Sequence, residues 1–350
     1  MSDDLGVLDR YLTIWIALAM ALGVGVGRFV PGIAELLNAI TWQGTSLPIA
    51  LGLFVMIYPI MAKIDYGSVP RVTRTSRREI GLTLAFNWLV APFVMYGLAV
   101  LFLGGYPEFV TGLIIVGIAP CIAMVLVWNE LASGNQEMCA VCVGVNSVLQ
   151  IALFVPYAFL FLTVFRGTGI DVQIGLIAQM VLVFLGLPLA LGYLTQKVAF
   201  STVGRDAYYR RFVPRIDPFG LLGLLFTIVV MFALKGEYIV ANPERIVLIA
   251  TPLFVFFVGL WGLAYGASAV LGFEYAESSS VAFTAASNNF ELAIAVAVAV
   301  FGIGSNVALA TVIGPLIEVP VMLALVRVAL ATRERLWPAE QEVSRVAYSD

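Results

Sequence analysis

The sequence predicts an all-α polytopic membrane protein, and its composition and the arrangement of its apolar residues support this fold class. Hydrophobic residues make up 61% of the 350-residue chain, and charged residues make up only 12%. The mean hydropathy is +1.00, whereas soluble domains carry about 25% charged residues. The apolar residues gather in long stretches that a soluble core is too small to bury. Lipid is therefore expected to surround most of the chain.

Ten apolar stretches each approach the length of about 20 residues that a helix needs to cross a bilayer. Their backbone groups must be hydrogen-bonded within the segment, which favours helices. A transmembrane barrel would require alternating strands of about ten residues, and the sequence does not contain them. The predicted spans cover residues 11–30, 47–63, 79–103, 111–131, 137–165, 172–197, 216–235, 246–271, 279–302 and 306–327.

The distribution of Lys and Arg predicts the orientation of these spans. With ten spans, both termini lie on the same side of the membrane. All but four of the 19 cationic residues fall on that side, the exceptions being Arg28, Arg166, Lys235 and Arg245. The positive-inside rule therefore places both termini in the cytoplasm. The N-terminal residues lack the layout of a secretory signal peptide, and no basic face indicates a nucleic-acid partner.

An internal repeat is predicted, with five spans in residues 1–167 and five in residues 168–350. Because five is odd, the second half must be inverted relative to the first, as in many secondary carriers. The short loops leave no room for a separate soluble domain. Prolines fall at similar places in the two halves, pairing Pro48 with Pro218, Pro92 with Pro252, and Pro156 with Pro320.

The fourth and ninth spans are predicted to be discontinuous. Pro120 lies within the fourth span, where it removes a backbone donor and breaks or kinks the helix, and Cys121 follows it directly. The ninth span contains the polar run Ser287-Asn288-Asn289 at the corresponding position. Broken helices at matched positions of an inverted repeat predict a substrate site near the middle of the membrane.

Glu291 is the most informative single residue, because a carboxylate inside the membrane is costly and usually functional. The chain has no His, so a carboxylate must carry any proton that is handled. Burial disfavours the charged form, which allows binding and release of protons. The alternative is a structural carboxylate that caps the exposed amides of the neighbouring half-helix.

Three cysteines lie in apolar stretches, and no disulfide framework is implied. Cys121, at the proline break, offers a soft thiol that suits a soft metal or metalloid, although a free Cys is commonly a small buried hydrophobe. Cys139 and Cys142 share one face of a helix and are interpreted as packing residues. A site with three thiolates would hold its cargo too tightly for turnover.

The other polar residues within the spans are expected to face the helix bundle, where polar groups find partners. Asn146 and Glu318 lie in the last span of each half, near the predicted breaks of the fourth and ninth spans, and helix packing is an equally good explanation for each. Trp128 is either a gate at the cytoplasmic end of the fourth span or an interfacial anchor. Asn87 and Gln150 complete this set.

At these residues the sequence resembles the arsenite efflux permeases of the arsenical-resistance type, within the bile acid/arsenite/riboflavin transporter superfamily. The resemblance covers nearly the whole chain. Its motifs here are Ile118-Ala-Pro-Cys-Ile-Ala-Met-Val-Leu-Val-Trp128-Asn129 and Ser287-Asn-Asn-Phe-Glu-Leu-Ala293. Many members have Arg directly before the cysteine, where this chain has Pro120, so any role of that Arg is not carried over.

The resemblance implies ten helices divided between a panel and a core domain, with the fourth and ninth helices crossing. It implies export of arsenite, and in some members antimonite, in exchange for protons across the plasma membrane, without a further cofactor. The family's essential cysteine and glutamate fall on Cys121 and Glu291. The other positions that the family uses fall on Asn289, Trp128, Asn146 and Glu318. Asn288 is expected to bind substrate beside Asn289, and Asn87 to support the site.

Three other classes of function remain open. A sodium-coupled symporter of organic anions, of the bile-acid type, is the main alternative, although this chain has Pro120-Cys121 where that branch often has Pro-Gly-Gly. A membrane receptor or scaffold would show no flux. An enzyme is disfavoured, because the sequence contains no pairing of nucleophile and base and no cluster of metal ligands.

Overall fold

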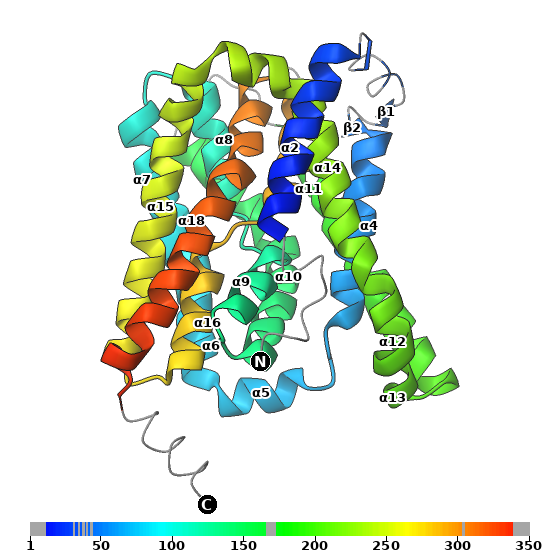
Figure 1. The fold of residues 1–350 in the computed structure, drawn as a ribbon, viewed down its shortest axis with the longest axis vertical. Helices are drawn as coiled ribbons and strands as arrows, with labels where there is room; N and C mark the ends of the chain where they lie inside the picture. Colours follow the sequence, from blue (N-terminus) through cyan, green and yellow to red (C-terminus); the bar gives the residue numbers. More distant parts are fainter. Residues whose placement is uncertain are drawn as a thin grey trace, which may run out of the picture. The chain divides into compact units, whose positions relative to one another are not determined.

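A computed structural model describes residues 12–30, 32, 33, 36, 39, 41, 42, 45–165, 173–302 and 305–338. Helices dominate this part of the chain (Figure 1). One small antiparallel hairpin pairs β1 (Thr41–Trp42) with β2 (Thr45–Ser46). The helical class that the sequence predicts is therefore confirmed.

Six helical runs of the described residues are long and apolar enough to cross a membrane: Arg77–Leu103, Gln136–Phe165, Ile174–Thr202, Arg205–Leu234, Pro243–Val270 and Asn306–Leu336. Four apolar helices are shorter: Ile14–Phe29, Ala50–Lys63, Pro107–Gly117 and Phe290–Phe301. Each predicted span overlaps one of these ten segments. The count of ten crossings and the inverted repeat remain predictions, because the shorter helices do not reach spanning length.

Some of the long runs are assembled from several elements. These are α6 (Arg77–Ala85), η1 (Phe86–Val90) and α7 (Ala91–Leu103); α10 (Gln136–Ala158) and η2 (Phe159–Phe165); α11 (Ile174–Val181), η3 (Leu182–Gly186) and α12 (Leu187–Thr202); and α13 (Arg205–Ala207), η4 (Tyr208–Phe212) and α14 (Val213–Ala241). The other helices are α2 (Leu12–Phe29), α4 (Leu47–Lys63), α5 (Val69–Thr75), α8 (Pro107–Gly117), α9 (Met124–Leu131), α15 (Pro243–Val270), α16 (Tyr275–Ala286), α17 (Phe290–Phe301) and α18 (Asn306–Leu336).

Prolines account for three of the π-helical segments, η1, η3 and η4. A proline has no N–H, so the carbonyl four residues earlier loses its helical donor and the backbone widens into a π turn. Pro92 has this effect on the Trp88 carbonyl in η1. The Tyr157 hydroxyl of α10 donates a hydrogen bond to that oxygen. A neighbouring helix thus supplies a donor to the carbonyl whose α-helical donor the proline removes.

The chain forms two compact units, and neither is continuous in sequence. Of the described residues, the first contains those up to Lys63, those within Asp171–Ile249 and those within Glu291–Ile313. The second contains Ile64–Ile170, Ala250–Phe290 and the residues from Gly314 onward. Each unit therefore takes segments from both predicted halves of the chain.

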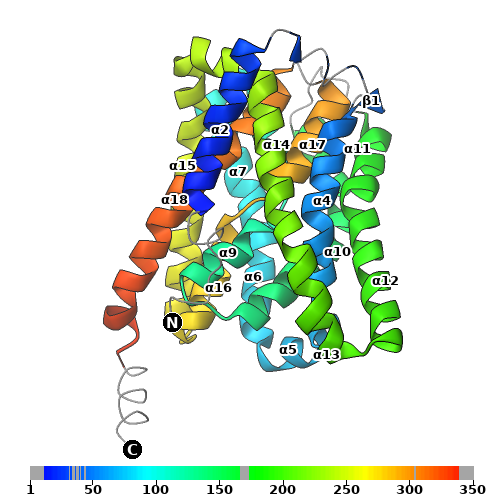
Figure 2. The ribbon, with the colours of Figure 1, turned by 45° about the vertical axis from the view of Figure 1, so that its right-hand side comes forward.

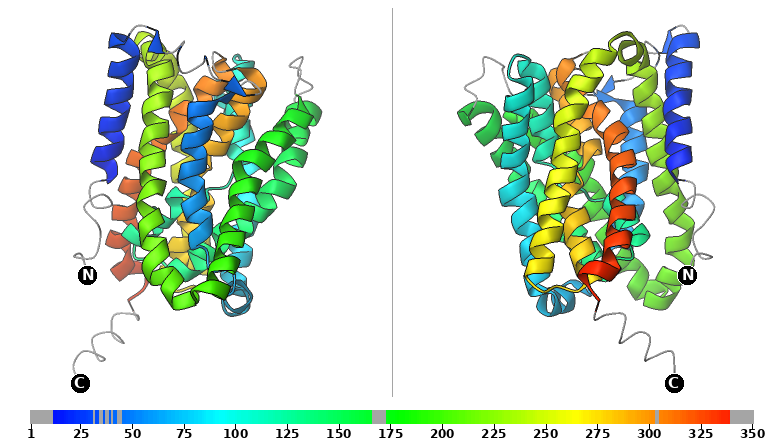
Figure 3. Two further views of the ribbon diagram at one scale, coloured as in Figure 1. Left: turned by 90° about the vertical axis from the view of Figure 1, so that its right-hand side faces the viewer. Right: turned by 60° about the vertical axis from the view of Figure 1, so that its left-hand side comes forward.

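In the first unit, α14 packs against α2 and α4, and α4 also packs against α12. Figure 2 and the left view of Figure 3 show α14 between α2 and α4. Glycines permit this close approach. A Cβ atom on Gly27 would lie 2.3 Å from the Ala233 carbonyl oxygen, and one on Gly223 would lie 2.7 Å from the Met56 nitrogen. Small residues at helix contacts are typical of membrane proteins.

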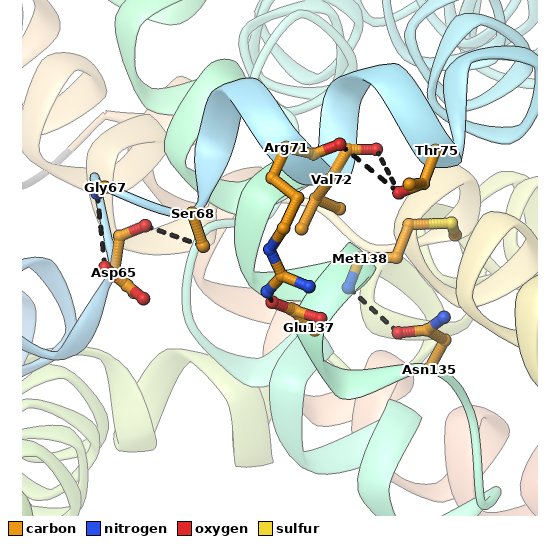
Figure 4. A network of polar contacts seen from close by, with 9 residues as sticks. All are labelled: Asp65, Gly67, Ser68, Arg71, Val72, Thr75, Asn135, Glu137 and Met138. Carbon is orange, nitrogen blue, oxygen red and sulfur yellow. Dashed lines mark hydrogen bonds and ion pairs between the residues drawn. The ribbon is translucent and has the colours of Figure 1, made fainter.

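In the second unit, α16 packs against α6, α9 and α10, and α7 packs against α8. Several helix ends meet at one end of this unit. Arg78 donates a hydrogen bond to the Leu271 carbonyl, 3.5 Å away, and lies over the Phe273 ring. The Trp337 indole N–H donates to the Phe273 carbonyl at 2.7 Å. Arg71 of α5 pairs with Glu137 of α10, as Figure 4 shows.

Basic residues are concentrated at this same end of the second unit. Arg71 and Arg74 lie on α5, Arg77 and Arg78 begin α6, and Arg333 lies in the last turn of α18. In the first unit, Lys63 at the end of α4 forms an ion pair with Asp217 of α14. These basic residues are among those that the sequence places on the cytoplasmic side, and the orientation itself remains a prediction.

The glycine contacts of α2 generate a prediction with an internal control. Gly27→Ala should lower the free energy of unfolding by about 1–3 kcal/mol, because its new methyl group overlaps the backbone of α14. Gly25→Ala, on the same helix, meets no atom within 4 Å in the described structure and should leave stability unchanged or slightly raised. Thermal unfolding of the detergent-purified variants measures both effects. Equal melting temperatures for the two variants would contradict the packing of α2 on α14.

Candidate functional site

The first break lies between α8 and α9, at residues 118–123. Pro120 has no N–H, so the Val116 carbonyl loses the donor it would have in a continuous helix. The Ala119 N–H donates to Val116 instead, at 3.1 Å, and the helix ends. Cys121 follows in the non-helical segment and is 1% exposed. The break predicted at Pro120 is therefore present.

The second break lies between α16 and α17, at residues 287–289. Ser287 has extended backbone angles, and its N–H makes the last helical bond of α16, to Phe283. Ser287, Asn288 and Asn289 are all buried. This break also lies where the sequence predicts it.

The two breaks are joined by an antiparallel backbone bridge between Pro120 and Asn288. The Cys121 N–H donates to the Ser287 carbonyl at 3.1 Å, and the Asn289 N–H donates to the Ala119 carbonyl at 2.7 Å. Buried backbone groups without partners are costly, and more so within a membrane. Each break thus satisfies polar groups that the other exposes, and the pairing brings Cys121 next to the polar run of the second break.

Gln150 of α10 contacts both breaks and indicates their depth. It donates a hydrogen bond to the Pro120 carbonyl at 3.3 Å and accepts one from the Asn289 side chain at 3.1 Å. The run Gln136–Phe165 has 30 residues. At about 1.5 Å per residue, Gln150 lies about 21 Å along a helix of about 45 Å. The two paired breaks, which we call the crossing, are therefore level with the middle of this span.

The side chain of Asn288 has a defined orientation. Its Nδ2 group donates to the carbonyls of Val116, at 3.0 Å, and Ala119, at 3.4 Å. Both carbonyls can only accept, so the amide nitrogen must face them. The Asn288 Oδ1 atom and the Ser287 hydroxyl have no hydrogen-bond partner among the described residues. Two buried oxygen atoms able to accept hydrogen bonds therefore belong to residues whose backbone pairs with the Pro120–Cys121 segment.

A second set of contacts fastens α9 to α16. The Ser280 hydroxyl donates to Asn129 Oδ1 at 2.7 Å, and the Tyr275 hydroxyl donates to the Ala132 carbonyl at 2.7 Å. The Asn135 N–H donates to the Ala276 carbonyl at 2.9 Å. These bonds link α9 to α16, the half-helices that lie between the breaks and the end of the second unit where the basic residues of α5 and α6 are concentrated.

The other predicted site residues are buried but have different surroundings. Asn146 accepts a hydrogen bond from the Trp88 indole at 3.1 Å, and its Nδ2 has no partner among the described residues. Asn87 lies in the π turn η1, next to Trp88. Trp128 is 1% exposed, which disfavours the alternative of an interfacial anchor. Glu318 lies buried within α18.

Glu291 belongs to the first unit, and the chain passes from the second unit to the first between Phe290 and Glu291. Glu291 lies in the first turn of α17 and is 8% exposed. The positive end of a helix dipole favours a negative charge in this position. Glu291 therefore follows the second break directly in the chain. Its position at the start of α17 is compatible with both interpretations, a carboxylate that caps the half-helix and one that binds protons.

The remaining thiols do not form a cluster with Cys121. Cys139 and Cys142 are fully buried on α10, and the Cys139 sulfur lies 3.9 Å from the Thr284 hydroxyl. In the part of the chain that the structure describes, no group of three or more His, Cys, Asp or Glu residues is arranged to hold a metal ion. A site of three thiolates is therefore not formed.

Sequence reasoning missed two features of the site. Gln150 was recognised only as a polar residue within a span, although it lies one helical turn from Asn146 and therefore on the same face of α10. Ser280 gave no signal, because a serine in an apolar helix is common and its contact with Asn129 joins two distant segments.

Known proteins resemble this chain over nearly its whole length. The sequence model described as the sodium bile acid symporter family matches residues 50–242. An arsenical-resistance protein, Acr3 of Corynebacterium glutamicum, is 45% identical over 98% of this chain and 94% of its own length. Acr3 of Alkaliphilus metalliredigens is 35% identical over 95% of each chain. An uncharacterized transporter of Synechocystis sp. is 37% identical over 95% of this chain and 90% of its own length.

The junction of α9 and α16 can be tested at Gly134. A Cβ atom there would lie 1.9 Å from Asn129 Oδ1 and 3.0 Å from the Ser280 hydroxyl. Gly134→Ala should therefore displace the Asn129 side chain and lower the free energy of unfolding by about 1–3 kcal/mol. Gly262→Ala, which meets no atom within 4 Å in the described structure, is the control. A thermal midpoint for Gly134→Ala equal to that of the control would show that the junction contributes nothing to stability.

Proposed function

The chain belongs to the sodium bile acid symporter family, and on this basis we propose that it is a secondary transporter that exports arsenite from the cytoplasm in exchange for protons. Membership of this family agrees with the prediction of a transporter rather than an enzyme. The observation that carries the proposal is the pairing of the two breaks at mid-span, which joins the Cys121 backbone to Ser287 and the Pro120 backbone to Asn288, two residues with buried oxygen atoms that can accept hydrogen bonds.

The chemistry of the crossing suits the neutral trihydroxide form of arsenite. Its hydroxyl groups donate hydrogen bonds, and Asn288 Oδ1 and the Ser287 hydroxyl are available to accept them. The Cys121 thiol is a soft ligand for trivalent arsenic. When the sulfur replaces one hydroxide on arsenic, the thiol proton leaves with that hydroxide as water. Reversal by water then releases the cargo, which one thiol permits more readily than three.

The names of two relatives support this choice of substrate, because both are arsenical-resistance proteins. Antimonite also forms a neutral trihydroxide and is also a soft partner for thiols, so we include it as a second substrate. Asn289, Asn146 and Trp128 complete the proposed substrate site. Glu318 and Asn87 are proposed to support it from neighbouring helices.

Proton coupling is assigned to Glu291. In this scheme, Glu291 is ionised while cargo is held and protonated while the empty site returns. Protons entering from the more acidic outside then drive export. The absence of His from the sequence leaves carboxylates as the side chains suited to this task, and buried carboxylates within membranes are usually functional.

We also propose the remaining architecture on the strength of the sequence pattern. Ten spans form two inverted repeats, the two compact units correspond to the panel and core domains, and the protein lies in the bacterial cytoplasmic membrane with both termini in the cytoplasm. The basic residues gathered at one end of the second unit support this orientation.

The alternative is a sodium-coupled symporter of an organic anion, which the description of the family favours. Against it, the Asn288 Oδ1 atom and the Ser287 hydroxyl oxygen are available to accept hydrogen bonds. A hydroxylated substrate can donate to them, whereas a carboxylate has no proton to donate. Replacing sodium with choline in a transport assay distinguishes the two. Sodium-independent arsenite export is expected, whereas sodium-dependent uptake of an organic anion would favour the alternative.

The first test of this proposal measures arsenite retention in cells that lack their own efflux systems. Cells expressing the native chain should retain little arsenite, and cells expressing Cys121→Ala should retain as much as cells without the protein. Cys142→Ala removes another fully buried thiol and is the matched control, with retention expected to stay low. Low retention with Cys121→Ala would remove the thiol from the mechanism. High retention with a well-expressed native chain would contradict arsenite export itself.

The second test concerns coupling and uses everted membrane vesicles with an imposed proton gradient. Glu291→Gln should reduce arsenite accumulation to the level of vesicles without the protein, because Gln cannot exchange a proton. Glu291→Asp keeps an ionisable group and should retain part of the activity. Near-native gradient-driven accumulation by Glu291→Gln would end the assignment of proton coupling to this residue.

A further inference from the structure

Gln150 connects a third helix to both breaks. It is fully buried on α10. Its Nε2 group donates to the Pro120 carbonyl at 3.3 Å, and its Oε1 atom accepts from the Asn289 side chain at 3.1 Å. One side chain thus touches the backbone of the first break and a side chain of the second.

The geometry leaves this amide a single productive orientation. The Pro120 carbonyl only accepts hydrogen bonds, so the NH2 group of Gln150 must face it. The Gln150 oxygen then faces Asn289, which must present its own NH2 group. The direction of the Asn289 carbonyl oxygen is therefore set by Gln150. The Pro120 carbonyl of the first break thus sets the orientation of the Gln150 amide, which in turn sets that of the Asn289 amide.

The contact with Pro120 also restrains the residue that follows. The Pro120 carbonyl and the Cys121 N–H belong to the same planar peptide group. The carbonyl oxygen is held by Gln150, and the N–H is held by the Ser287 carbonyl at 3.1 Å. With its oxygen bonded to α10 and its N–H bonded to the second break, the peptide plane cannot rotate freely. The direction in which Cys121 projects its thiol is thereby restricted.

We propose that Gln150 is a positioning residue, which orients the Pro120–Cys121 peptide and the Asn289 amide so that the crossing binds arsenite. This inference rests on the proposed function, in which the crossing is the substrate site. Gln150 is not assigned a contact with the cargo. Its effect on binding passes through Cys121 and Asn289.

The test measures arsenite binding to the purified full-length protein by equilibrium dialysis over a series of pH values, expressed per folded protein. Gln150→Met has a similar length but neither donates nor accepts in this way. It should bind arsenite about tenfold more weakly at every pH, the change expected when one hydrogen-bonded contact is misplaced. A residue that only stabilised the fold would instead lower the melting temperature and leave the affinity of the folded fraction unchanged.

Gln150→Glu is the rescuing variant. A protonated carboxyl donates to Pro120 and accepts from Asn289, as Gln does, whereas an ionised carboxylate cannot donate. At acidic pH, the arsenite affinity of Gln150→Glu should therefore equal that of the native chain. As the pH rises and the carboxyl ionises, its affinity should fall below that of the native chain at the same pH. Ser147→Ala is the matched control, since the Ser147 hydroxyl is buried on the same helix and donates only within it, to Val143. Its affinity should equal that of the native chain.

Two results would overturn the positioning role while leaving the proposed function in place. One is native affinity in Gln150→Met. The other is a loss in Gln150→Glu that persists at acidic pH and equals that of Gln150→Met, which would indicate packing alone. A native chain that binds no arsenite at any pH would overturn the proposed function, and this inference with it.

Discussion

The requirement that every buried backbone group has a hydrogen-bond partner governs the centre of this structure. In lipid, an interrupted helix has no water to satisfy its free N–H and carbonyl groups. Here the interruption at Pro120 and the interruption at Asn288 supply partners to each other. Each break alone would be costly. Together they form a short antiparallel bridge, which explains why two irregular segments persist among apolar helices.

The same requirement explains the polar side chains around the bridge. Pro120 removes the α-helical donor of the Val116 carbonyl, which accepts hydrogen bonds from the Ala119 N–H and from the Asn288 amide instead. Pro92 leaves the Trp88 carbonyl in the same situation, and the Tyr157 hydroxyl donates to it. In both cases the proline and the residue that donates come from segments far apart in the sequence. Each proline therefore leaves a specific carbonyl group that can accept a further hydrogen bond. The side chain that donates to it restricts how the neighbouring segments pack.

Much of this arrangement could be predicted from the sequence, and the limits of prediction have physical causes. Hydropathy located the apolar helices, because lipid imposes a simple composition on each span. Pro120 and the run Ser287-Asn288-Asn289 revealed the breaks, because residues that interrupt helices are rare within apolar segments. The contacts of Gln150 and Ser280 were not predicted. Their partners lie far away in sequence, and a single polar residue does not identify the one it will meet.

On the proposed function, the orientation of Asn288 also bears on selectivity. Because its amide nitrogen is occupied by two backbone carbonyls, the side chain offers the cargo an acceptor and no donor. A neutral trihydroxide can donate to such an acceptor, whereas an oxyanion would bring its own lone pairs against it and would leave its charge without compensation. The proline that breaks the helix is thus linked to the chemistry of the cargo. Pro120 ends the helix and thereby exposes the carbonyls of Val116 and Ala119 to the second break, where the Asn288 amide nitrogen donates to both and its oxygen atom remains able to accept.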